Sequence, residues 1–76
     1  MKINKLEFDV VIERDDEGYY IGSVPVLPGC HTQAKDLDEL MGRMKEAIEL
    51  YLEINPGAKK RPATHFAGVQ RVMVSA

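Results

Sequence analysis

The clearest pattern in the chain is an alternation of apolar and polar residues over positions 5–13. Every second side chain is apolar, which predicts a strand with one face in a core; these residues are Leu6, Phe8, Val10 and Ile12. Asp15 to Gly18 follows as a turn, and the aromatic and β-branched residues from Tyr19 to Val24 predict the return strand. We expect Cys30 to Ala34 to form a short third strand and Val69 to Ser75 a last one.

Between the third and last strands, the spacing of apolar residues changes to that of an amphipathic helix. Its stripe consists of Leu37, Leu40, Met41, Met44, Ala47, Ile48, Tyr51 and Leu52. Asp36 is the expected N-cap, and Glu39 three residues later completes a capping-box pattern. Asn55 precedes Pro56 and therefore ends the helix. Gly42 lies in the middle of the helix, where we interpret it as a point of close approach to the sheet.

The elements follow the order β-β-β-α-β, which indicates an α+β fold of two layers. The helix returns the chain to a strand parallel to the first, so we expect a four-stranded mixed sheet in the order 3-2-1-4 with one helix on one face. Pairing Arg14 with Tyr19 across the first turn leaves apolar side chains on the face that the helix does not cover. The residues expected there, and proposed as an oligomer interface, are Val11, Tyr20 and Val24.

The length of 76 residues corresponds to one domain, residues 1–76, with a thin core. Domains of this size often gain stability from a disulfide, a metal or a partner subunit. Cys30 is the only cysteine and no zinc-ligand cluster is present in the sequence, so we expect a homo-oligomer, a dimer or tetramer. The N-terminus lacks a signal-peptide pattern and no apolar run is long enough to span a bilayer, so the expected location is the cytoplasm.

Residues with catalytic potential do not form a recognisable constellation in the sequence. His31 and His65 have no acid or nucleophile at a telling spacing, and Cys30 is interpreted as a small buried apolar residue. The carboxylates around the first turn are better explained as a solvated hairpin tip than as a two-metal site. We therefore expect no enzymatic activity, no metal and no cofactor.

Acidic residues dominate the charged positions, and the net charge is −2. We expect a basic partner to bind them, because complementary potentials accelerate association; the candidates are Asp15, Asp16, Glu17, Glu46, Glu49 and Glu53. The alternative function is an RNA-binding or weakly nucleolytic domain that uses the basic run Lys59-Lys60-Arg61 to contact phosphates.

Several short motifs in this order resemble the HicB-like antitoxin family of HicA–HicB modules, with the resemblance covering residues 3 to about 54. They are Asp16 to Tyr20, Val24 to Cys30, Thr32-Gln33, Leu37 to Leu40 and Lys45 to Ile48. The resemblance implies a partly degraded ribonuclease-H-like fold without its catalytic carboxylates. It also implies a role in binding HicA, a small basic RNA-cleaving toxin, and covering its active site. Full-length antitoxins of this family typically append a DNA-binding domain, which we do not expect in residues 1–76, so no direct DNA binding is expected.

Overall fold

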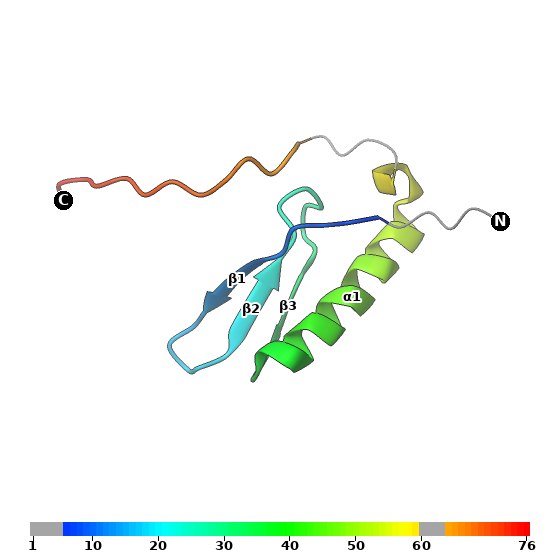
Figure 1. Cartoon of the computed structure of the whole chain (residues 1–76), viewed down its shortest axis with the longest axis horizontal. Helices are drawn as coiled ribbons and strands as arrows, with labels where there is room; N and C mark the ends of the chain where they lie inside the picture. Colours follow the sequence, from blue (N-terminus) through cyan, green and yellow to red (C-terminus); the bar gives the residue numbers. More distant parts are fainter. Residues whose placement is uncertain (1–5, 60–63) are drawn as a thin grey trace.

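The computed structural model describes residues 6–59 and 64–76. A three-stranded sheet packs on one side against a single long helix, which gives a two-layer α+β body (Figure 1). In chain order the elements are strands β1 (Val11–Arg14), β2 (Tyr20–Ser23) and β3 (His31–Ala34), helix α1 (Leu37–Ile54) and a 3₁₀ turn η1 (Pro56–Lys59). The α+β class and the single helix on one face are as predicted.

The strands pair in the order β1-β2-β3, and both pairs are antiparallel. The predicted register of the first hairpin was wrong by one residue, because Arg14 pairs with Tyr20 and Ile12 pairs with Gly22. A shift of one residue moves side chains to the opposite face of a strand. Its consequence here is that Tyr20 faces the helix.

Two consecutive tight turns connect β2 to β3. The amide of Leu27 donates to the carbonyl of Val24, and the amide of Cys30 donates to the carbonyl of Leu27, each at 3.0 Å. Gly29 adopts a φ of 83°, a conformation that favours glycine. This corner places Leu27 in the hydrophobic core, where its side chain is fully buried.

The predicted N-cap of α1 is confirmed. The Asp36 carboxylate accepts a hydrogen bond of 2.8 Å from the amide of Glu39. The Glu39 carboxylate forms an ion pair with Arg43 at 2.6 Å. Arg43 in turn donates to the carbonyl of Gln33 at 3.0 Å, which links this flank of α1 to β3.

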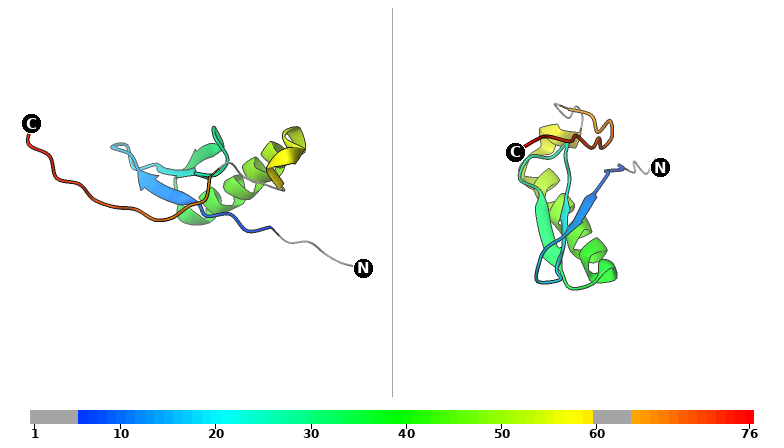
Figure 2. Two further views of the ribbon diagram at one scale, coloured as in Figure 1. Left: turned by 90° about the horizontal axis from the view of Figure 1, so that it is seen from above. Right: turned by 90° about the vertical axis from the view of Figure 1, so that its left-hand side faces the viewer.

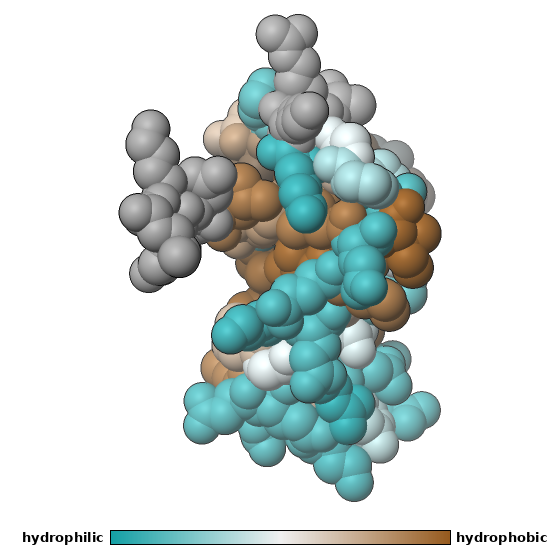
Figure 3. Space-filling view, turned by 90° about the vertical axis from the view of Figure 1, so that its right-hand side faces the viewer, coloured by the Kyte–Doolittle hydropathy of each residue, from teal (hydrophilic) through white to brown (hydrophobic). Residues whose placement is uncertain are grey.

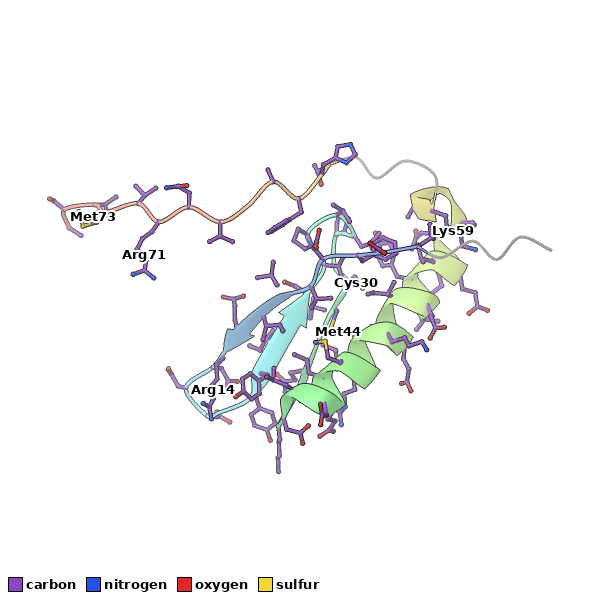
Figure 4. The ribbon with its side chains drawn as sticks, in the orientation of Figure 1. Arg14, Cys30, Met44, Lys59, Arg71 and Met73 are labelled. Atoms are coloured by element: carbon purple, nitrogen blue, oxygen red, sulfur yellow. The ribbon has the colours of Figure 1, made fainter. Side chains whose placement is uncertain are left out.

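Helix and sheet are in close contact at Gly22, on the central strand. A Cβ atom at this position would lie 2.8 Å from Met44 Sδ and 3.2 Å from Val10 Cγ1. Figure 4 shows Met44 pointing from α1 toward the sheet. Gly42, which we expected to allow this approach, is exposed and has open space around its Cα. The interpretation of Gly42 was therefore wrong, and the bare glycine belongs to the strand.

The predicted last strand, Val69 to Ser75, is not formed in this single chain. Residues 64–76, called the C-terminal arm below, are exposed and extend away from the body (Figures 1 and 2). The sheet is therefore three-stranded and antiparallel in place of the predicted four-stranded mixed sheet. Alternating apolar residues favour an extended conformation, but a strand also needs an edge to pair with, and the arm does not lie beside one.

Gly22 and Gly42 provide a matched pair of substitutions. Gly22→Ala should lower the free energy of unfolding by about 1–3 kcal/mol, because the added methyl group displaces buried Met44. Gly42→Ala should raise it by up to about 1 kcal/mol, because the site is open and alanine favours a helix. Urea unfolding followed by circular dichroism measures both changes. Equal effects of the two substitutions would contradict the assignment of the close contact to Gly22.

Candidate partner-binding surfaces

The first predicted acidic site is the turn between β1 and β2. The Asp15 carboxylate accepts hydrogen bonds from the amides of Glu17 and Tyr19, both at 2.9 Å. Gly18 completes the turn with a φ of 91°. Asp15 is thus committed to holding the hairpin, whereas Asp16 and Glu17 are exposed. Only the latter two present carboxylates that a partner could use without opening the turn.

The second predicted acidic site lies on α1. Glu46, Glu49 and Glu53 are all exposed, on the face of the helix that points away from the sheet. The hairpin turn and the C-terminal half of α1 lie at opposite ends of the body in Figures 1 and 2. The structure therefore separates the six predicted acidic residues into two groups that cannot form one compact site.

The three residues predicted as an oligomer interface do not share a face of the sheet. Tyr20 contacts the core on the helix side, with the Arg14 guanidinium 5.1 Å from its ring centroid. Val24 is 2 % exposed and belongs to the core itself. Val11 pairs with Ser23 and lies on the uncovered face. These residues were expected on one face because the predicted register of the hairpin was wrong by one residue. Contact with another subunit stays a prediction for them.

Side chains with reactive groups are not gathered anywhere in residues 6–59 and 64–76. Burial raises the pKa of the Cys30 thiol, which favours the unreactive protonated form. His31 and His65 are exposed and belong to different parts of the chain. Within these residues no three His, Cys, Asp or Glu side chains are placed to share a metal ion. No helix in the same ranges is long and apolar enough to cross a membrane.

The basic run that motivated the alternative function lies only partly within the described residues. Lys59 is exposed at the end of η1, where Figure 4 shows it at the top of the helical segment. Lys60 and Arg61 lie outside the described residues. The described part of the run thus consists of one exposed lysine, and no observation favours an RNA-binding site there.

Exposed apolar surface on α1 is a feature that the sequence interpretation missed. Leu37 and Met41 were assigned to the buried stripe but are about half exposed, on one flank of the helix. Leu50 and Ile54 are still more exposed on the other flank. Figure 3 shows apolar surface in the upper half of the side on which α1 lies and mainly hydrophilic surface below it. The signal for this exposed surface in the sequence was the number of apolar positions along the helix, which is larger than a three-stranded sheet can cover.

A shallow cleft of about 220 Å³ lies beside the segment that precedes β1. It is lined by Glu7, Phe8, Asp9, Val26, His65 and Phe66. The first residues of the C-terminal arm thus lie against the body near the start of β1, and the remainder of the arm leaves from there. The lining contains two phenyl rings, one imidazole and two carboxylates, and no arrangement that indicates a particular ligand.

Comparison with known proteins decides the family. Residues 8–73 match the family described as the HicB-like antitoxin of bacterial toxin–antitoxin systems. The chain belongs to the HicB-like antitoxin family. A protein of Archaeoglobus fulgidus named UPF0150 protein is 58% identical over 91% of this chain and 96% of its own length. The UPF0150 protein ssr1258 of Synechocystis is 46% identical over 95% of this chain and the whole of its own length. The UPF0150 protein Ta0767 of Thermoplasma acidophilum is 46% identical over 63% of this chain and 70% of its own length.

The match extends the resemblance found in the sequence in one respect. That resemblance ended near residue 54, whereas the family match continues to residue 73 and includes most of the arm of this HicB-like chain. The arm is therefore part of the domain that the family shares.

The two roles of the turn carboxylates can be separated by substitution. Asp15→Ala should lower the free energy of unfolding of the HicB-like chain by about 1 kcal/mol, because two backbone amides lose their acceptor. Asp16→Ala makes the same change of charge at an exposed carboxylate and should have little effect. Thermal unfolding at equal ionic strength measures both, and an equal loss in the two variants would contradict the structural role of Asp15.

Burial of Cys30 leads to a prediction about reactivity and pH. The thiol should react with iodoacetamide much more slowly in the folded HicB-like chain than in concentrated guanidinium chloride, because it is buried and its pKa is raised. Folding favours the protonated thiol because the pKa of Cys30 is raised in the folded state. The protonated thiol therefore contributes fully to the stability of the fold at neutral pH, and this contribution is lost as the pH rises past the ordinary pKa range of a thiol. Equal rates of alkylation in both states would contradict this burial.

Proposed function

We propose that this HicB-like chain neutralises a small basic HicA-type RNA-cleaving toxin by binding it and masking its active site, without catalysis of its own. Membership in the antitoxin family is the observation that carries the proposal. The family implies a toxin as partner, and the identity of that toxin as HicA-like belongs to the proposal. An RNA-cleaving target places the proposed action in the cytoplasm.

The charged surfaces support a basic partner. Glu46, Glu49 and Glu53 extend from a rigid 18-residue helix, whereas Asp16 and Glu17 lie at a hairpin tip. A rigid row of carboxylates loses little conformational entropy when a cationic surface docks on it. We therefore assign the main toxin contact to the outer face of α1 and a secondary contact to the hairpin tip.

The proposal includes a homo-oligomeric antitoxin that does not itself bind DNA. A small core and several exposed apolar side chains, such as Ile12, Met41 and Leu50, favour association with another copy. The net charge of −2 disfavours contact with a phosphate backbone.

Co-expression with a HicA-type toxin tests the proposed role. Growth should be restored and the two proteins should copurify. Glu49→Lys/Glu53→Lys should weaken the complex on the order of tenfold at low salt, with the difference from wild type shrinking as salt is added. Asp16→Lys/Glu17→Lys makes the same change in net charge at the hairpin tip and should have a smaller effect.

Failure of the wild-type chain to restore growth or to copurify would overturn the masking role. A larger effect at the hairpin tip than on α1 would keep the role but contradict the assignment of the main contact. Salt-sensitive binding of RNA by the isolated chain would favour the alternative function instead.

A further inference from the structure

The C-terminal arm has the composition of a β-strand but no strand beside it. From Val69 to Ser75 the arm includes four large apolar side chains that are 76–93 % exposed: Val69, Val72, Met73 and Val74. Figure 4 shows Arg71 and Met73 on a segment that no other element of the body accompanies. A contiguous apolar segment of this exposure is unusual in a monomer and marks an interaction surface.

The overall dimensions show how far the arm departs from the body. The radius of gyration is 14.5 Å, whereas a compact chain of this length has about 11 Å. The longest dimension, 54 Å, is twice the next, 27 Å. The arm therefore extends well beyond the compact body.

The outer edge of the sheet at β1 lies near exposed apolar side chains. β1 pairs only with β2 among the described strands, so its other edge is open. Ile12 pairs with Gly22, whose bare Cα faces Met44 of the helix, so Ile12 also points to the helix side. It is 44 % exposed there, because α1 packs over β3 and β2 rather than over β1.

The exposed flank of α1 borders the same edge. Arg43 contacts the carbonyl of Gln33, which fixes that side of the helix over β3. Leu37 and Met41 are four residues apart and lie more than 100° around the helix from Arg43, on the side toward β1. Together with Ile12 they are three exposed apolar side chains on the side of the open edge, called the β1-side apolar patch below.

We propose that the C-terminal arm of one copy pairs with the β1 edge of a second copy, with the exchange reciprocal in a two-fold dimer. Each sheet then gains a fourth strand from its partner, parallel to β1, and each β1-side apolar patch is covered. Val72 and Val74 share one side of the arm and pack against Met41 and Ile12 of the second copy. Arg71 lies on the other side of the arm and stays in solvent. Both unpartnered features of the single chain, the arm and the edge, are satisfied by the same contact.

The course of the arm favours pairing with the β1 edge of a second copy over pairing with the β1 edge of its own chain. Its base is held at the cleft near the start of β1, where His65 and Phe66 contribute to the lining. Beyond it, Gly68 has a φ of 152°, a backbone conformation that side chains other than glycine rarely adopt, and the following residues lead away from β1. A glycine at this point supports the outward course of the arm.

Mass measurements on the isolated protein test the exchange without any toxin, so their result does not depend on the proposed masking of the toxin. A monomer would also contradict the homo-oligomer that the proposed function includes. Wild type should have twice the chain mass of 8.5 kDa in analytical ultracentrifugation. Met41→Lys and Val72→Asp/Val74→Asp should each raise the dimer dissociation constant at least about tenfold, because each places a charge in the apolar contact between arm and patch. Ile54→Lys, on the other flank of α1, and Arg71→Ala should leave it unchanged.

A monomeric wild type would overturn the proposal. A dimer that dissociates with Ile54→Lys but not with Met41→Lys would also overturn it, because the interface would then be the other flank of α1. Circular dichroism of each variant checks that the body remains folded, and Met41 is exposed enough in the single chain for lysine to be tolerated.

Cysteine pairing distinguishes exchange from closure of the arm on its own body. A chain with Glu13→Cys on β1 and a second chain with a cysteine at Gln70, Arg71 or Val72 are unfolded together, refolded and oxidised. Exchange gives a disulfide between the two different chains from at least one arm position, whereas Glu49→Cys on the outer face of α1 gives none. A chain that carries both Glu13→Cys and the arm cysteine is the control for closure. An intrachain disulfide in this double variant, with no disulfide between the two single-variant chains, would show that the arm closes on its own sheet and would overturn the exchange.

Discussion

The fold depends on the contact between a bare backbone position on the central strand and a methionine of the helix. Gly22 lies on β2, and Met44 fills the space that any other side chain there would occupy. Because Leu40 and Met44 are one turn apart and both fully buried, this contact fixes the depth and the rotation of α1 on the sheet. The positions of every exposed residue on the helix follow, including the carboxylates assigned to the toxin and the apolar flank beside β1.

Local signals predicted the elements well and their relations less well. The helix start at Asp36, the turn at Asp15 to Gly18 and the antiparallel order of the first three strands were all readable, because each depends on residues close in sequence. The register was wrong by one residue, since a turn can close with either Tyr19 or Tyr20 opposite Arg14. That single error misplaced the predicted oligomer interface. Pairing of the last strand could not be read at all, because alternation identifies a strand but not its neighbour.

The site predictions show a related limit. An acidic residue is equally visible in the sequence whether its carboxylate binds the backbone or projects into solvent. The hydrogen bonds of Asp15 assign it to the turn, while Glu49 and its neighbours on α1 remain available to a partner. Family membership then provides what local chemistry could not, since no arrangement of described side chains indicates a toxin as the ligand. The structure locates the exposed carboxylates, and membership in the antitoxin family implies a toxin as partner in general.

The sequential order of the strands has a consequence for how the protein folds. Each strand pairs with its nearest neighbour in the chain, and α1 follows immediately and packs on β3 and β2. The strand pairings therefore need only the short connections between consecutive strands to close, and the entropic cost of closing a loop is smaller for short connections. The core and the contacts between elements all lie within residues 6–59, so the body can fold without residues 64–76. The helix face therefore does not have to wait for any association that needs the arm.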